Sequence, residues 1–215
     1  MIHRPFDCSE LITQLGNSVA PRSTGLHVST LYGKLHPQKK RSGPGKGLDE
    51  TDLKTYRFAG LALEAVIEEA MIRIFVDRMN RDPDYRGSVS RPPEQFSAEG
   101  IACSPDLLFE EEGERIVGEL KVTWMSCSDV PEEEGENEFA AKFDKYFTQI
   151  KAYCHVTGCS RGRLFIYFVN GPYRPMPKPV LMAWDLEFTQ QEIEETWDAL
   201  ICIATEEPGG ISEEE

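Results

Sequence analysis

The sequence has no apolar run that approaches the length of about eighteen residues needed for a membrane-spanning helix, and its N-terminus lacks the apolar core of a signal peptide. Cysteine is also sparse, because the six cysteines are scattered without a single C-x-x-C pair. We therefore expect reduced thiols rather than a disulfide framework. These absences predict a cytoplasmic protein that does not associate with membranes.

Positive charge is in short supply as well. The chain has 23 lysines and arginines against 37 aspartates and glutamates, and its formal net charge is −14. This balance is unusual for a protein that handles nucleic acid, because phosphates favour a basic surface. The charge is unevenly distributed, however, since residues 11–48 contain no acidic residue and six basic ones. This segment is either a basic arm that contacts phosphates through Lys39, Lys40 and Arg41, or a polar loop that merely lacks acids.

The composition suits one globular domain. The 215 residues are 40% hydrophobic and 28% charged, which is enough apolar material for a core without disulfides. We expect a basic arm at residues 1–48 packed on a core at 49–205, followed by a disordered acidic tail at 206–215.

The stretch from Ser104 to Trp124 carries the strongest chemical pattern. An apolar segment, a Glu/Gly-rich turn and a segment of alternating character follow one another, which predicts a β-hairpin. Strand side chains repeat every two residues, so Glu119 and Lys121 project to the same face, and Asp106 at the end of the preceding strand can reach it. Two carboxylates and an ammonium are thus expected to converge. Carboxylate oxygens suit Mg²⁺ or Mn²⁺, and the amine can orient water or stabilise charge on phosphorus.

These residues resemble a known family. Pro105-Asp106, twelve intervening residues and Glu119-Leu120-Lys121 are similar to the motif of the PD-(D/E)xK nuclease superfamily. Three further segments occur in the order found in its RecB-like and lambda-exonuclease-like branch. They are the V-S-x-L-like segment His27-Val28-Ser29-Thr30-Leu31, the first-helix motif Gly60-x-x-x-Glu64 and the later-helix motif Gln149-x-x-x-Tyr153.

The resemblance implies a role for each matching residue. Asp106 and Glu119 would hold Mg²⁺ or Mn²⁺, with Glu64 as a third metal carboxylate and the Leu120 carbonyl as a backbone ligand. Lys121 would position the attacking water. Without the family, Glu64 would be read as a solvated glutamate on a helix surface.

The later-helix motif has two readings. The resemblance implies that Gln149 and Tyr153 hold the site and the DNA strand. The alternative is an amide and a ring that pack a helix against the sheet, and both can hold together.

The order of elements predicts an α/β fold with a restriction-endonuclease-like core, in which a central mixed β-sheet is flanked by helices in the order αβββαβ. Residues 80–95 have the composition of a loop. The expected elements are a helix at 49–78, a strand at 96–103, the hairpin at 107–124, a helix at 138–157, strands at 163–170 and 180–187, and a helix at 189–203.

The preferred functional hypothesis is a metal-dependent deoxyribonuclease, a phage-type or RecB-like exonuclease of recombination or repair. Its rivals are a structure-selective or restriction-type endonuclease on the same fold, and a catalytically silent nucleic-acid-binding module. The resemblance implies DNA as a partner, with a single-strand annealing or recombination protein and a homo-oligomer as further possibilities.

Two other cofactors are not expected. Cys154, His155 and Cys159 form a cluster without a second ligand pair, which disfavours zinc. Some RecB-like relatives carry a four-cysteine iron-sulfur cluster with three cysteines near the C-terminus. Here only Cys202 lies beyond Cys159, so no iron-sulfur cluster is expected.

Overall fold

A computed structural model describes residues 26–37, 50–82, 86–92, 95–130, 139–174 and 176–206. Lys39, Lys40 and Arg41 of the expected basic arm lie outside these ranges, as does the expected tail from residue 207 onward. Among the helices within these ranges, none is both long and apolar enough to cross a membrane.

The centre of the fold is a five-stranded sheet in the order β2-β5-β6-β7-β8. Its neighbours pair antiparallel except β6 and β7, which are parallel, so the sheet is mixed as expected. The strands are β2 (Gly87–Ser90), β5 (Leu107–Glu111), β6 (Glu114–Thr123), β7 (Arg161–Phe168) and β8 (Val180–Glu187).

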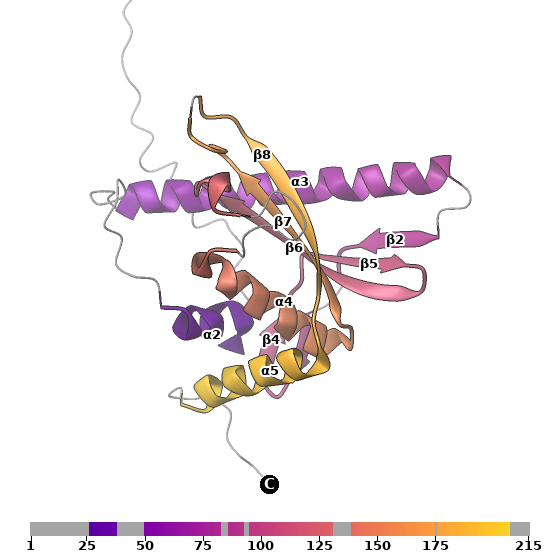
Figure 1. The fold of residues 1–215 in the computed structure, drawn as a ribbon, viewed down its shortest axis with the longest axis vertical. Coiled ribbons are helices and arrows are strands. Elements are labelled where there is room, and N and C mark those ends of the chain that lie inside the picture. Colours follow the sequence, from indigo (N-terminus) through magenta and orange to yellow (C-terminus); the bar gives the residue numbers. More distant parts are fainter. Residues whose placement is uncertain are drawn as a thin grey trace, which may run out of the picture.

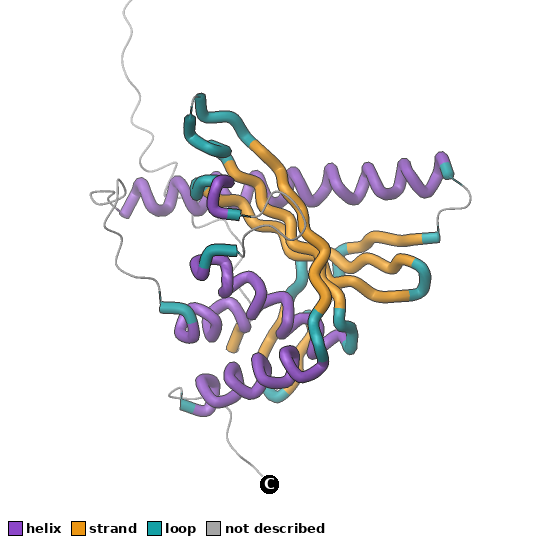
Figure 2. The backbone as a smooth tube through the Cα atoms, in the orientation of Figure 1, coloured by secondary structure: helices purple, strands orange, loops and turns teal. Residues whose placement is uncertain are grey.

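Helices cover both faces of this sheet, which confirms the α/β class (Figures 1 and 2). The long helix α3 crosses one face, while α2, α4 and α5 gather on the other. The helices are α2 (Val28–Leu35), α3 (Glu50–Arg81), α4 (Asp144–Thr157) and α5 (Gln190–Thr205), with short 3-10 turns η1 (Cys127–Asp129) and η2 (Ala141–Phe143).

The predicted alternation along β6 holds in the packing. Val117 belongs to the core beneath α2, α4 and α5, whereas Ile116 and Leu120 belong to the core beneath α3. Since successive strand side chains point to opposite faces, Glu119 and Lys121 share the face of Val117. The strand therefore presents its charged pair toward α4.

The prediction of a single strand at residues 96–103 is wrong. This segment is a hairpin of β3 (Phe96–Ala98) and β4 (Ile101–Cys103), which joins β1 (Leu26–His27) in a separate small sheet of order β1-β4-β3. The chain reverses at Glu99 and Gly100, whose φ values of 48° and 75° belong to the left-handed region of a tight turn.

The edge strand β2 lies in the segment that composition predicted to be a loop, and it pairs with the β5–β6 hairpin in place of the strand expected at 96–103. It pairs with β5 from Gly87 opposite Glu111 to Ser90 opposite Leu108. The helix expected from residue 138 is also shorter, because α4 begins at Asp144 after the turn η2.

Gly118 fixes how closely β6 approaches its neighbour. A Cβ at Gly118 would lie 2.7 Å from Phe109 Cε2 and 2.9 Å from Leu107 Cβ, whereas a Cβ at Gly33 in α2 would meet nothing within 4 Å. We predict that Gly118→Ala lowers the free energy of unfolding by about 1–3 kcal/mol through overpacking. The matched change Gly33→Ala should raise it by up to about 1 kcal/mol through helix propensity. Urea denaturation of both variants tests this, and equal shifts would contradict it.

Candidate active site

The candidate site lies where one edge of β6 is no longer covered by β5. Pairing with β5 stops at Gly118 opposite Leu107, while pairing with β7 continues to Thr123. Beyond Gly118, side chains bond this edge instead. Asp106 Oδ2 accepts from the Leu120 N–H at 2.8 Å, and Val122 N–H donates to a carboxylate of α3. The loop before β5, strand β6 and helix α3 therefore meet at one place.

Glu64 is the residue of α3 that reaches this edge. Its Oε1 accepts the Val122 N–H at 3.2 Å. Burial raises the pKa of Glu64, although the charge on Lys121 and the Val122 N–H act in the opposite direction. Glu64 is therefore directed into the site rather than lying on a solvated helix surface.

Glu119 is the most constrained charge in this region. Glu119 is 0% exposed, and its Oε1 forms an ion pair with Lys121 Nζ. Apart from that ion pair, neither carboxylate oxygen has a hydrogen-bond partner among the described residues. Burial raises the pKa of Glu119 well above its usual range, and the nearby charge of Asp106 adds to this, while Lys121 lowers it. A buried carboxylate with unused acceptor sites is expensive unless a cation satisfies it.

Lys121 stays positively charged in this setting. Burial lowers the pKa of Lys121, but the carboxylates of Glu119 and Asp106 more than offset burial, so the pKa lies above its ordinary value. Its Nζ also lies 5.9 Å from the ring centroid of Tyr146 on α4. An ammonium donates hydrogen bonds and stabilises negative charge, so the geometry favours positioning of water over proton abstraction.

The donors at this edge fit a hard divalent cation. Within the ranges that the structure describes, no three His, Cys, Asp or Glu side chains are grouped as a metal-binding set. Mg²⁺ commonly takes only one or two protein carboxylates and keeps several waters. Asp106 and Glu119 supply such carboxylates. The Leu120 carbonyl lies on the same edge as its N–H, because both groups of one strand residue point the same way.

Gln149 and Tyr153 form a buried layer on the α4 side of the site. They are 5% and 2% exposed, and the Gln149 amide donates to the Tyr153 hydroxyl. Burial raises the pKa of Tyr153 well above its usual range, and the nearby carboxylates of Glu119 and Asp106 add to this. Tyr153 therefore lies close enough to Glu119 and Asp106 to feel their charges, and contact of the pair with a DNA strand stays a prediction.

Tyr146 is the residue near the site that the sequence reasoning did not assign a role. It lies three residues before Gln149 on the same helical stripe, and that spacing was the available signal. Two ammonium groups approach its ring, those of Lys121 at 5.9 Å and Lys145 at 4.9 Å from the centroid.

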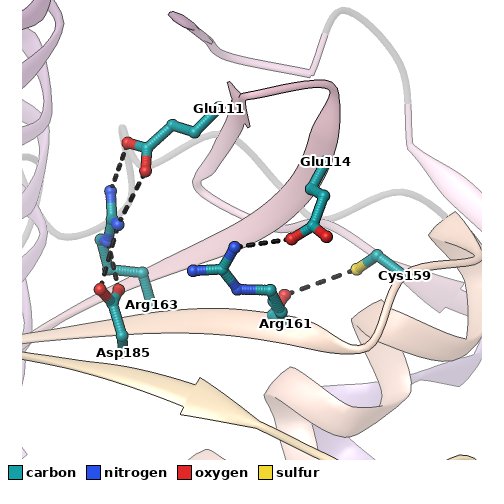
Figure 3. Close-up of polar contacts among 6 residues, drawn as sticks. All are labelled: Glu111, Glu114, Cys159, Arg161, Arg163 and Asp185. Atoms are coloured by element: carbon teal, nitrogen blue, oxygen red, sulfur yellow. Dashed lines mark hydrogen bonds and ion pairs between the residues drawn. The ribbon is translucent and has the colours of Figure 1, made fainter.

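A network of ion pairs around Arg161 and Arg163 of β7 links neighbouring strands of the sheet (Figure 3). Arg163 donates to both carboxylate oxygens of Glu111, at 2.9 and 3.2 Å, and to those of Asp185, at 2.5 and 3.2 Å. Arg161 Nη1 donates to Glu114 at 2.7 Å. These bonds tie β5, β6, β7 and β8 together. Arg163 lies opposite Gly118, and its guanidinium packs over Phe109 on the α3 face, whereas Glu119 points to the α4 face.

Cys159 lies beside this network and carries a reactivity prediction. Its thiol lies 3.5 Å from the Arg161 carbonyl (Figure 3), and a hydrogen bond from Cys154 lowers the pKa of Cys159 to about 6. Because the thiolate is the nucleophile, Cys159 should be alkylated at pH 7 several-fold faster than the exposed Cys202. Peptide mass spectrometry after brief iodoacetamide treatment measures this, and Cys154→Ala should remove the difference. Faster labelling of Cys202 in the wild type would contradict the prediction.

The comparisons with known proteins concern the fold. No protein-family model matches the chain, and no curated protein matches its sequence. Among solved structures, the chain is similar to LHK-Exo in complex with dAMP, at 15% identity and a TM-score of 0.49 over 91% of this chain and 89% of that one. LHK-Exo is an alkaline exonuclease from Laribacter hongkongensis, and a second structure of it gives 14% identity and a TM-score of 0.48 over 90% and 89%.

The chain is also similar to a phage related exonuclease from Haemophilus somnus 129PT. The identity is 12% and the TM-score 0.48, over 85% of this chain and 92% of that one.

Proposed function

We propose that this protein is a metal-dependent deoxyribonuclease that hydrolyses phosphodiester bonds at the uncovered edge of β6. One observation carries the proposal. The carboxylate of Glu119 is completely buried, has unused acceptor sites and lies against the ammonium of Lys121. Such a charge arrangement is costly for a structural core and suits a site that receives a cation.

The cation would be Mg²⁺ or Mn²⁺. Asp106, Glu119 and the Leu120 carbonyl would hold it, with Glu64 contributing directly or through water. When bound, the metal would act as a Lewis acid on a phosphoryl oxygen and lower the pKa of a coordinated water. Its charge would also compensate the buried carboxylate of Glu119.

The side chains have separable roles in the proposed reaction. Lys121 orients the attacking water in line with the scissile bond and stabilises the negative charge that develops on the phosphate. Gln149 and Tyr153 hold α4 against the strand that carries Glu119. We propose that three basic residues contact the DNA backbone, namely Lys39, Lys40 and Arg41. Their positive charges would attract phosphates whatever the base sequence of the DNA.

Within this function we favour an exonuclease of the phage or RecB-like type. The basis is the order of the four motifs along the chain, which resembles that branch. A strand-annealing or recombination protein as partner, and a homo-oligomeric assembly, belong to the same proposal.

Incubation of the protein with Mg²⁺ or Mn²⁺ and end-labelled linear, nicked and closed circular DNA tests the proposal. Degradation of linear DNA with sparing of closed circles is the expected result. Cutting of the circles would identify the endonuclease instead. Asp106→Asn is the control for a contaminating nuclease. If the folded wild-type protein cleaves none of these substrates with either metal, the proposal is contradicted. The catalytically silent binding module would then be the remaining hypothesis.

A further inference from the structure

Three aromatic residues gather just beyond the end of β6. Trp124 follows the last residue of the strand, and the ring of Tyr56 on α3 meets it edge-on, with centroids 5.2 Å apart at 81°. Tyr173, in the connection between β7 and β8, donates its hydroxyl to the Trp124 carbonyl. Tyr56 and Tyr173 are 45% and 44% exposed. Trp124 itself is half-buried. Three separate segments thus bring aromatic residues to one location, with the two tyrosines exposed, and this group is here called the aromatic platform.

Trp124 packs against α3 at Gly60. A Cβ at Gly60 would lie 3.7 Å from Cζ3 and 3.8 Å from Cη2 of the indole, which is ordinary van der Waals contact. Gly60 is buried. The indole therefore lies against the helix that carries Glu64, at the glycine of the Gly60-x-x-x-Glu64 motif.

The aromatic platform adjoins the proposed site. Tyr56, Gly60 and Glu64 follow one another at four-residue spacing on α3, so Tyr56 and Glu64 are separated by two helical turns, or about 12 Å along the axis. Trp124 lies three residues beyond Lys121 along the chain, about 10 Å away. Its ring packs against α3 whereas Lys121 faces α4, so the aromatic platform adjoins the proposed site on the side of Glu64. Figure 1 shows the N-terminal half of α3 alongside this end of the sheet.

Positive charge accompanies the aromatic rings. Arg57 follows Tyr56 on α3, and Arg174 follows Tyr173, and both arginines are exposed. Proteins that bind single-stranded nucleic acid combine exposed aromatic rings with basic residues, because bases stack on rings while cationic groups attract phosphates. The chain as a whole has a net charge of −14, so these two exposed arginines place positive charge near the proposed site in an otherwise acidic protein.

We propose that Tyr56, Trp124 and Tyr173 form a subsite that stacks a nucleobase of a single-stranded polynucleotide end as it enters the active site. The inference rests on the proposed nuclease function, because the polynucleotide is its substrate. Stacking on a ring tolerates any base, so the subsite would select an unpaired strand rather than a sequence.

Equilibrium binding separates stacking from simple charge attraction. Fluorescence anisotropy is measured in EDTA, which prevents cleavage, with a labelled oligothymidylate and an abasic oligonucleotide of equal length. Tyr56→Ala should weaken binding of the oligothymidylate by about 5- to 100-fold. It should leave binding of the abasic strand unchanged, and the salt dependence should not change, because no phosphate contact is removed. Tyr173→Ala, which also changes an exposed side chain, should behave in the same way.

Val66→Ala is the matched control, because Val66 is 67% exposed on the same helix but is aliphatic. It should bind both strands like the wild type. The subsite is overturned if Tyr56→Ala and Tyr173→Ala bind the oligothymidylate normally, or lose affinity equally for the abasic strand. Base-dependent binding without any cleavage would keep the subsite and remove the nuclease. Failure of the wild type to bind either strand would remove the subsite but not the nuclease, because EDTA also removes the cation proposed to contact the phosphate.

Discussion

Lys121→Met is expected to reduce the rate of DNA cleavage by about a thousand-fold, the loss typical of removing a preorganised group that stabilises transition-state charge. The thioether chain keeps most of the volume of lysine but carries no charge and donates no hydrogen bond. In the wild type the ammonium is held against Glu119 and kept protonated by its carboxylate neighbours. Single-turnover cleavage of end-labelled DNA in saturating Mg²⁺ measures the effect on the chemical step.

Lys151→Met is the matched control for this change. The Lys151 side chain is 19% exposed, close to the 20% of Lys121, and it pairs with Glu192 at 3.7 Å away from the site. It should retain nearly full activity. Retained cleavage by Lys121→Met would remove Lys121 from the proposed chemistry.

The same change should also reveal the cost of burying Glu119. In EDTA, Lys121→Met leaves a buried carboxylate without its ion pair, which is expected to lower the free energy of unfolding by about 3 kcal/mol near pH 8. The pKa of Glu119 is raised in the folded state, so the folded protein binds the proton more tightly than the unfolded chain. The deficit should therefore shrink as the pH falls through that raised pKa toward the ordinary glutamate value.

The double variant Glu119→Gln with Lys121→Met completes this comparison. It removes both charges together, and its stability should lie above that of Lys121→Met at pH 8. Chemical denaturation of the wild type, Lys121→Met and the double variant at pH 5 and pH 8 gives the free energies of unfolding that are needed. An equal deficit at both pH values would show that Glu119 is not the titrating group.

Asp106→Asn and Glu119→Gln are expected to weaken Mn²⁺ binding by at least about a hundred-fold, because each removes one of the two carboxylates proposed to hold the cation. Asp106→Asn is the cleaner variant. Its amide oxygen can still accept the Leu120 N–H that Asp106 accepts at 2.8 Å, so the local backbone should be preserved. Isothermal titration of the metal-free proteins measures the affinities.

Glu68→Gln serves as the control for general loss of negative charge. Glu68 lies one turn from Glu64 on α3 and pairs with Arg91. It should bind Mn²⁺ nearly as well as the wild type. Unchanged affinity in Asp106→Asn would place the metal elsewhere or exclude it.

The sequence contained enough information for α3, α4 and α5 and for the hairpin that carries Glu119, whereas α2 was not among the expected elements. Alternation along 115–124 predicted which face each side chain takes, because one face of β6 packs under α3 and the other under α4. The capping box of α5 was also predictable, and Thr189 and Glu192 bond each other as that pattern requires. Periodicity in a short stretch of sequence is therefore enough to predict side-chain direction where both faces of a strand are buried.

The errors arose where pairing partners decide the structure. Residues 96–103 read as one strand, but the left-handed turn at Glu99 and Gly100 folds them into a hairpin on a different sheet. Strand β2 has the polar sequence Gly87-Ser-Val-Ser90 and exists because β5 offers it an edge. Neither long-range pairing is encoded in a short window of sequence.

The candidate site shows the same division. Convergence of Asp106 with β6 followed from strand geometry, whereas the reach of Glu64 to the Val122 N–H depends on where the β5 pairing ends. The contact of Trp124 with Gly60 likewise needs the docking of α3 on the sheet.

A crystal soaked in Mn²⁺ and measured for anomalous scattering tests the proposed metal site most directly. A difference peak is expected at the uncovered edge of β6, in contact with the carboxylates of Asp106 and Glu119 and with Lys121 close by. The proposed nuclease would be contradicted if Mn²⁺ fully occupied other positions in the crystal but not the uncovered edge of β6. In that outcome Asp106 and Glu119 would also point to opposite sides of the sheet.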